Sequence, residues 1–278
     1  MLGSLFRNRW LVMTCAVVVG CLALVALASS WPSARAQEDP GYVLVKRFPH
    51  DPKAYTQGLA FKGDRLFEGT GIEGSSWLRR VALKTGKVRK QRDLADRYFG
   101  EGITIIGDRI FQLTWKNERA FVYDVDTFKR LRTFDYSDDG DDGTEEGWGL
   151  ADNGRTLAMS DGSEFIRFRN PNTFEVIREI RVTENGTPIF RLNELEWISD
   201  EIFANVFGDD YIVRINATTG EVTGRIDIAA LRRREENAEN CQPEVTNGIA
   251  YMPTQKRFFV TGKWWCHVYE IRLTDPPG

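Results

Sequence analysis

A single carboxylate, Glu101, lies between Gly100 and Gly102 at the start of a short apolar run. Glycines on both sides let the backbone turn tightly and let a ligand approach the chain closely. A core gains nothing from a glutamate at such a place, so the pattern favours a carboxyl group presented to a ligand. Taken alone, the same stretch could be a turn whose glutamate faces water.

The pattern around Glu101 recurs along the chain, which argues against an isolated turn. In each copy a polar or aromatic residue precedes a glycine and an aliphatic residue, and a looser copy, Glu194-Leu195-Glu196, lacks the glycine. Successive copies are 44 to 53 residues apart. The closer copies are Gln57-Gly58-Leu59, Glu101-Gly102-Ile103, Trp148-Gly149-Leu150 and Asn247-Gly248-Ile249.

Each copy opens a longer repeating unit made of short strands. In the first unit, strand-like runs at residues 58–61, 66–70 and 77–83 are followed by a turn at residues 84–87 and a fourth strand. Short strands separated by Gly, Asp, Asn and Thr turns describe an antiparallel meander. An all-strand repeat of roughly 40–50 residues is what a β-propeller blade needs. The sequence therefore predicts an all-β, five-bladed propeller with four strands in each blade.

The last repeat is one strand short, because it ends with its third strand at residues 267–273. An unpaired strand-like segment at residues 42–48 can supply the missing fourth strand. The two ends of the chain would then meet in one blade, which removes an exposed sheet edge. A β-sandwich is the alternative, but it does not require equivalent strands at even spacing.

The start of the chain has the layout of a secretory signal peptide. Arg7 and Arg9 precede an apolar run at residues 10–28, and Ala34-Arg35-Ala36 offers a cleavage site before Gln37. We expect a signal peptide at residues 1–36, a single propeller domain at residues 37–278, and an exported protein, periplasmic or secreted. The alternative is an uncleaved membrane anchor, because the apolar run is long.

The rest of the sequence excludes several classes of function. The net charge is −3, and the basic cluster at residues 232–234 is followed at once by Glu235 and Glu236, so the sequence gives no sign of a nucleic-acid-binding surface. We expect residues 232–236 to form a solvated helical turn or loop. No later apolar run could span a bilayer. Whether Cys241 and Cys266 form a disulfide stays open. His50 and His267 are interpreted as structural.

An acidic run at residues 138–146 carries six carboxylates with interspersed glycines. We expect a mobile, solvated loop between the second and third blades, with a calcium loop as the alternative. Because this run precedes Trp148, it lengthens a loop near the rim of the channel and could alter which peptides enter.

In a propeller the first strand of every blade lines the central channel, so the residues that open these strands converge. A cavity of aromatic walls with a few polar groups is typical of a small-ligand or peptide-end site. We expect Trp115 and Lys263 to reach the rim of the same cavity. The converging residues are Gln57, Glu101, Trp148, the segment from Asn193 and Glu194 to Glu196, and Asn247.

Seven motifs, in order along the chain, together resemble the plant-type glutaminyl cyclases and their bacterial relatives, which are five-bladed propellers. The resemblance covers about residues 55–273. The motifs are Tyr55-Thr56-Gln57-Gly58-Leu59, Tyr98-Phe99-Gly100-Glu101-Gly102, Gln112-Leu113-Thr114-Trp115, Gly147-Trp148-Gly149-Leu150, Arg191-Leu192-Asn193-Glu194-Leu195-Glu196, Asn247-Gly248-Ile249-Ala250 and Val260-Thr261-Gly262-Lys263.

The resemblance implies an enzyme that cyclises the N-terminal glutamine of peptides or proteins to pyroglutamate with loss of ammonia, without a metal cofactor. Glu101 matches the family's acid/base glutamate. Lys263 would stabilise the tetrahedral oxyanion or keep Glu101 ionised. The remaining matches imply substrate binding: Gln57 and Asn193 would contact the amine or amide, and Trp115 and Trp148 would wall the pocket.

Two positions depart from the family pattern. Tyr55 stands where phenylalanine is common, and Phe207 stands where tryptophan is common, which removes an indole N–H from the substrate-binding set. We expect a monomer. Two other classes of function stay open: a non-catalytic propeller that binds peptide ends, and a metal-dependent propeller hydrolase with Glu101, Glu194 and Glu196 as ligands.

Overall fold

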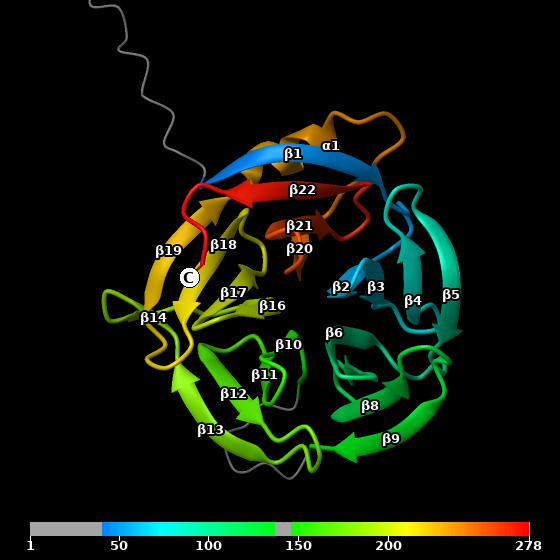
Figure 1. Ribbon diagram of the computed structural model, residues 1–278, viewed down its shortest axis with the longest axis vertical. Helices are drawn as coiled ribbons and strands as arrows, with labels where there is room; N and C mark the ends of the chain where they lie inside the picture. Colours follow the sequence, from blue (N-terminus) through cyan, green and yellow to red (C-terminus); the bar gives the residue numbers. More distant parts are fainter. Residues whose placement is uncertain (1–40, 137–145, 278) are drawn as a thin grey trace, which may run out of the picture. The chain divides into compact units, whose positions relative to one another are not determined.

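The computed structural model describes residues 41–136 and 146–277. Within these ranges the chain forms five antiparallel sheets of four strands, arranged around a common centre (Figure 1). The first blade contains β2 (Thr56–Lys62), β3 (Arg65–Thr70), β4 (Trp77–Ala82) and β5 (Lys87–Asp93). The second contains β6 (Gly100–Ile106), β7 (Arg109–Thr114), β8 (Arg119–Asp124) and β9 (Arg130–Asp135).

The later blades repeat this order, innermost strand first. The third contains β10 (Leu150–Asp152), β11 (Leu157–Ser160), β12 (Phe165–Arg169) and β13 (Val176–Arg181). The fourth contains β16 (Leu192–Ile198), β17 (Glu201–Val206), β18 (Tyr211–Asn216) and β19 (Val222–Asp227). The fifth contains β20 (Thr246–Met252), β21 (Arg257–Gly262), β22 (His267–Leu273) and, outermost, β1 (Tyr42–Pro49). A hairpin of β14 (Thr183–Glu184) and β15 (Thr187–Pro188) lies outside the blades.

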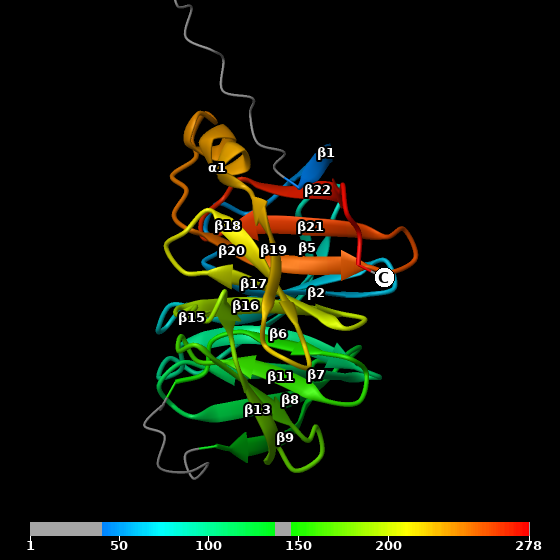
Figure 2. The ribbon, with the colours of Figure 1, turned by 90° about the vertical axis from the view of Figure 1, so that its left-hand side faces the viewer.

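The innermost strands of neighbouring blades contact one another in a closed cycle: β2 with β6, β6 with β10, β10 with β16, β16 with β20, and β20 with β2. The five-bladed propeller predicted from the repeats is therefore confirmed. The predicted closure is confirmed as well, because β1 pairs antiparallel with β22 from Tyr42↔Leu273 to Pro49↔His267. The first and last described strands thus lie side by side in one blade (Figures 1 and 2).

Each strand's place in its blade follows from its side chains. The second strand β7 (RIFQLT) is almost wholly buried, whereas the outer strand β9 (RLRTFD) is largely exposed. Apolar side chains on facing sheets pack between blades; Phe168 of the third blade, for example, shares a buried cluster with Leu195 and Val213 of the fourth. Burial of one such side chain is worth about 1.5–3 kcal/mol.

A short helix, α1 (Ala229–Glu236), lies outside the fifth blade beside β1 and β22 (Figure 2). The sequence predicted a solvated helical turn or loop here; a helix is present, but the prediction of a solvated segment was wrong for Glu235, which is fully buried. The Glu235 carboxylate accepts the Cys266 N–H at 2.7 Å and a hydrogen bond from the Tyr269 hydroxyl, and it lies 2.8 Å from His267 Nδ1. A charge can be buried in this way only where such partners surround it.

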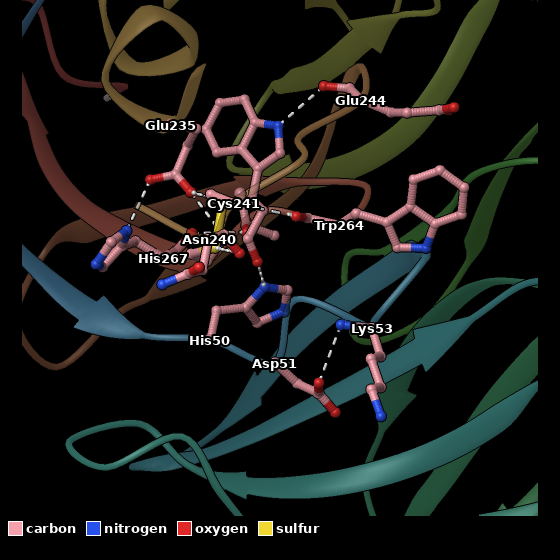
Figure 3. The surroundings of a disulfide bond; sticks show 12 residues. His50, Asp51, Lys53, Glu235, Asn240, Cys241, Glu244, Trp264 and His267 are labelled. Atoms are coloured by element: carbon pink, nitrogen blue, oxygen red, sulfur yellow. Dashed lines mark hydrogen bonds and ion pairs between the residues drawn. A yellow bond between two sulfur atoms is a disulfide. The ribbon is translucent and has the colours of Figure 1, made fainter. Parts of the chain in front are cut away.

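The disulfide question is settled by the fold, because Cys241 and Cys266 are bonded with their Cα atoms 5.8 Å apart (Figure 3). The bond ties the segment after α1 to the residue that precedes β22. It closes a loop across a sequence separation of 25 residues, and such cross-links restrict the unfolded chain.

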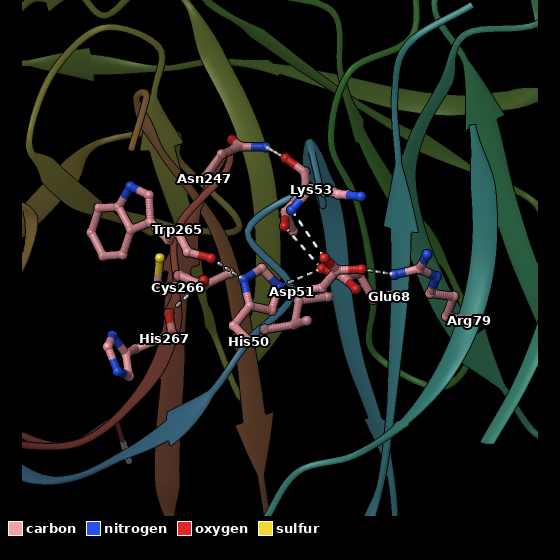
Figure 4. Close-up of polar contacts among 12 residues, drawn as sticks. His50, Asp51, Lys53, Glu68, Arg79, Asn247, Trp265, Cys266 and His267 are labelled. Atoms are coloured by element: carbon pink, nitrogen blue, oxygen red, sulfur yellow. Dashed lines mark hydrogen bonds and ion pairs between the residues drawn. The ribbon is translucent and has the colours of Figure 1, made fainter. Parts of the chain in front are cut away.

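A second buried network links the fifth blade to the first (Figure 4). The ring of His50 is hydrogen-bonded through Nδ1 to the Trp265 carbonyl at 2.6 Å and through Nε2 to Glu68 at 2.7 Å. Burial alone would lower the pKa of His50, but the Glu68 carboxylate outweighs it and raises that pKa above its ordinary value. His50 therefore holds two blades together, in keeping with the structural role predicted from the sequence.

Some predictions fall outside the described residues. The predicted signal peptide at residues 1–36 lies there, as does the acidic run except for Glu146. In the part of the chain that the structure describes, no helix has the length and apolar character needed to cross a membrane.

Candidate active site

A cavity of about 290 Å³ opens at one end of the central channel. Most of the predicted site residues line it, and they come from all five blades although they are far apart in sequence. Phe99, two residues before Glu101, lines it too and was not predicted. The lining residues are Tyr55, Gln57, Phe99, Glu101, Trp115, Trp148, Asn193, Phe207 and Lys263.

The innermost strands share an irregularity that positions these side chains. The pairing register of β2, β6, β16 and β20 with the next strand shifts near the strand's beginning. In β6 the shift lies between Gly100 and Ile103, and in β16 between Leu192 and Leu195, so it spans Glu101 and Asn193. A bulge of this kind re-aims the side chains next to it. In the first, second, fourth and fifth blades the repeated motif therefore coincides with a bulge, whereas the third-blade strand β10 pairs without a register shift.

Two of the repeated glycines are required because backbones of adjacent blades meet at the channel. A Cβ atom on Gly102 would lie 2.6 Å from the Trp148 carbonyl oxygen, and one on Gly149 would lie 1.9 Å from that of Asn193. The Gly102 N–H also donates to the Trp148 carbonyl at 2.8 Å. A larger residue would push the blades apart and displace the side chains that line the cavity.

Glu101 is 4% exposed. Its Oε1 accepts a hydrogen bond from Gln57 Nε2 at 3.0 Å, while its buried Oε2 has no hydrogen-bond partner among the described residues. Burial raises the pKa of this carboxyl well above its ordinary value; the positive charge of Lys263 opposes the shift, and the negative charge of Glu146 adds to it. Such a group can exchange a proton with a ligand at a pH above the ordinary range of a glutamate.

Lys263 is 3% exposed. Its Nζ lies over two aromatic rings, 4.6 Å from the centre of Tyr55 and 5.2 Å from that of Phe207. Burial lowers the pKa of this ammonium, and the charges of Glu101 and Glu244 oppose the shift. The expectation that Lys263 keeps Glu101 ionised is correct only in direction, because burial of Glu101 has the larger effect.

Asn247 does not line the cavity, although the sequence placed it in the binding set. It is fully buried, and its Nδ2 donates to the Thr56 carbonyl at 3.0 Å and to Gln57 Oε1 at 3.2 Å. With that oxygen engaged, the amide nitrogen of Gln57 is turned towards Glu101. Asn247 thus orients a lining residue from behind.

Glu194 also lies away from the cavity lining. Its two carboxyl oxygens accept backbone N–H groups from Leu59 at 3.1 Å and Ile249 at 2.6 Å, so one fully buried side chain joins the first, fourth and fifth blades. Burial raises the pKa of Glu194 well above its ordinary value. Glu196 likewise accepts the Tyr251 N–H at 3.1 Å. Both carboxyl groups thus join strands of different blades, and Glu194, which the sequence placed in the substrate-binding set, does not line the cavity.

The metal-hydrolase alternative requires Glu101, Glu194 and Glu196 to converge. Within residues 41–136 and 146–277, the three-residue group whose ligand atoms lie close enough to hold a metal ion is instead Glu235, Cys241 and Cys266. Both of those cysteines are in the disulfide. The carboxylates proposed as ligands in that alternative are therefore not assembled into one site.

The aromatic walls are held by contacts that the sequence did not reveal. The Trp115 ring packs against Phe99 with ring centres 5.4 Å apart, and the Trp148 ring packs edge-on against Phe207 at 5.8 Å. Both indole N–H groups donate to Glu146, the last residue of the acidic run. The interpretation of that run as a solvated loop was thus wrong for Glu146.

Comparisons with known proteins agree with this geometry. A family model described as glutamine cyclotransferase matches residues 16–273. The chain belongs to the glutamine cyclotransferase family. The family resemblance seen in the seven motifs is thereby confirmed.

Two known proteins are similar to this chain over most of its length. A glutaminyl-peptide cyclotransferase from Arabidopsis thaliana is 40% identical over 231 residues, which cover 83% of this chain and 70% of that protein. The crystal structure of the glutaminyl cyclase from Myxococcus xanthus superposes with a TM-score of 0.76 at 33% identity, covering 85% of this chain and 97% of that one.

Proposed function

We propose that this protein is a glutaminyl-peptide cyclotransferase that converts the N-terminal glutamine of peptides and proteins to pyroglutamate and releases ammonia. Family membership and both relatives support the activity. The observation that carries the mechanism is the buried Glu101 carboxyl in the cavity, with Oε1 held by Gln57 and Oε2 without a partner in the described part of the chain.

In the reaction the neutral α-amine of the substrate attacks its own side-chain γ-carbonyl carbon. Glu101 takes the proton that the amine nitrogen releases as the new C–N bond forms. It then gives this proton to the side-chain amide nitrogen, which departs as ammonia when the old C–N bond breaks. One carboxyl group serves as base and then as acid, for which a pKa near the working pH is favourable.

Lys263 supplies positive charge to the oxygen that becomes negative in the tetrahedral intermediate. A buried ammonium acts strongly there because little water screens it. Asn193, whose buried Oδ1 has no partner within the described ranges, accepts an N–H of the substrate. Trp115 and Trp148 confine the methylene groups, so that the glutamine side chain stays curled towards its own amine.

The activity is tested with a Gln-initiated peptide and the purified protein, followed by mass spectrometry and by an ammonia assay. The wild-type protein should release ammonia far faster than the spontaneous reaction. Glu101→Gln should lower kcat by about a hundredfold to ten-thousandfold while the peptide still binds. A folded wild-type protein without ammonia release would refute the assignment, and a Glu101→Gln variant with full turnover would refute the mechanism.

The rival functions give different results in the same assay. A non-catalytic binding protein would bind the peptide and leave it unchanged. A metal-dependent hydrolase would lose its activity after dialysis against a chelator, whereas we propose that the cyclase keeps full turnover, because no step assigned above uses a metal. Chelator-sensitive turnover that added metal restores would contradict this part of the proposal.

We further propose that the protein is exported, as its N-terminal sequence suggests, and acts as a monomer. The bond between Cys241 and Cys266 is in keeping with an oxidising compartment, and one chain supplies every residue that lines the cavity. N-terminal analysis of the mature protein should find a chain that begins at Gln37, itself open to cyclisation. Light scattering should give the mass of a single chain.

A further inference from the structure

Glu146 lies beside the cavity and makes an unusual pair of contacts. Its Oε2 accepts the indole N–H of Trp115 at 2.7 Å and that of Trp148 at 2.8 Å. Trp115 follows β7 in the second blade, whereas Trp148 precedes β10 in the third. A single carboxylate oxygen therefore joins the two indole walls of the cavity across a blade boundary.

The main chain around Glu146 is fixed to the same walls. The N–H of the next residue, Gly147, donates to the Trp115 carbonyl at 3.1 Å, and the Trp115 N–H donates to the Phe99 carbonyl at 3.0 Å. The other Glu146 oxygen, Oε1, lies 3.7 Å from Nζ of Lys116. With its carboxylate held from two sides, Glu146 has few ways to move without also moving an indole.

We propose that Glu146 is a positioning residue for the cyclisation, because it sets the orientation of both indole rings that confine the glutamine side chain. This inference rests on the proposed function. An indole ring that loses its N–H acceptor can rotate about the bond to its Cβ atom. The cavity would then admit more conformations of the substrate, and fewer of them would place the amine against the γ-carbonyl.

Glu146 has a second, electrostatic effect, because its negative charge raises the pKa of Glu101 further, beyond the larger effect of burial. The other charge on Glu101 is that of Lys263, which acts in the opposite sense. Burial, with a smaller contribution from the charge of Glu101, raises the pKa of the Tyr55 and Tyr136 phenols, so both stay neutral at working pH. The negative charge of Glu146 and its hydrogen bonds to the two indoles can therefore be tested separately by substitution.

Two substitutions separate them. Glu146→Gln keeps a side-chain oxygen that can accept two N–H donors but removes the charge, whereas Glu146→Ala removes both. We expect Glu146→Gln to keep kcat/KM within about threefold at its optimum and to shift the acid limb of the pH profile to lower pH. We expect Glu146→Ala to lose about tenfold to a hundredfold in kcat/KM, mostly in kcat, at every pH.

A matched control is Glu73→Ala, which removes an exposed carboxylate from the β3–β4 loop and should leave both constants unchanged. A folded Glu146→Ala with wild-type kcat/KM would overturn the proposal, and so would equal losses in the Gln and Ala variants. If the wild-type protein releases no ammonia, the proposed function fails instead, and this is seen before any variant is made.

A measurement on the wild-type protein does not depend on the folding of any variant. In an NMR spectrum the indole N–H protons of Trp115 and Trp148 should both be protected from exchange with solvent, because both are hydrogen-bonded to Glu146. Rapid exchange of either proton would overturn the proposal.

Discussion

Gln57 donates its side-chain N–H to Oε1 of Glu101 at 3.0 Å, across the boundary between the first and second blades. Because Gln57 is itself held through its oxygen by Asn247, the contact has a defined direction. It leaves Oε2 of Glu101 as the oxygen for a substrate proton. The relationship explains how a buried carboxyl can be fixed in place and still have one oxygen ready for chemistry.

The pH dependence of turnover should report the opposing effects on Glu101. Its pKa is raised by burial, so kcat should fall on the acid side at a pH above the ordinary range of a glutamate. Lys263 lowers that pKa, so Lys263→Met should move the acid limb to still higher pH and also reduce the maximal kcat. The measurement is kcat against pH for both proteins. A limb that moves to lower pH would contradict the assignment.

Asn247→Ala should weaken catalysis without touching the cavity. The Thr56 carbonyl and Gln57 Oε1 would both lose a buried donor, so we expect a loss of about 1–3 kcal/mol in the free energy of unfolding. Gln57 could then rotate away from Glu101, and kcat/KM should fall about tenfold. In a Gln57→Ala background the further loss of activity should be much smaller. Equal losses in both backgrounds would show that Asn247 acts by another route.

Gly149→Ala should destabilise the protein by more than about 3 kcal/mol, because the new Cβ would lie 1.9 Å from a backbone oxygen that cannot easily move. Gly224→Ala, on the outer strand β19, is the control. Its Cβ would meet only the Arg214 side chain at 3.6 Å, so we expect a change within about 1 kcal/mol. Urea unfolding of the three proteins tests this, and similar midpoints for the two variants would count against tight contact between the innermost strands.

The His50–Glu68 pair should make stability depend on pH. The pKa of His50 is higher in the folded protein than its ordinary value of about 6.5, so folding binds the proton more tightly. The contribution is complete below about pH 6.5 and is lost as the pH rises through the folded pKa. Wild-type protein should therefore exceed His50→Ala in unfolding free energy by more at about pH 6 than at about pH 9. A difference in unfolding free energy that grows with pH would contradict this prediction.

Sequence reasoning succeeds for features that repeat or that lie close together in the chain. Each blade is a local meander, so turn residues and a steady period were enough to predict five of them. The missing strand in the last repeat predicted the pairing of β1 with β22. Convergence of Gln57, Glu101 and Trp148 followed from the shared position of their motifs at the start of innermost strands.

Sequence reasoning fails where a side chain's direction depends on register. Neighbouring residues point in different directions, so Asn193 lines the cavity while Glu194 ties strands together, and the motif alone does not show which of the two faces the channel because a bulge spans both. The predictions for Glu146 and Glu235 were wrong for another reason. Each stands in a charged run typical of solvated chain, and one decisive partner of each, Trp115 for Glu146 and Tyr269 for Glu235, lies about thirty residues away.

The pairing of β1 with β22 has a consequence for how the molecule is made. The residues of β1 are synthesised well before those of β22, and the ring of blades cannot close until β22 is present to pair with β1. Until then the fifth blade lacks its outer strand, and the cavity walls contributed by Lys263 and Tyr55 have no fixed spacing. Catalytic competence therefore appears only once β22 has been synthesised and has paired with β1. A chain that lacks β1 or β22 should be an open, aggregation-prone intermediate rather than a slower enzyme.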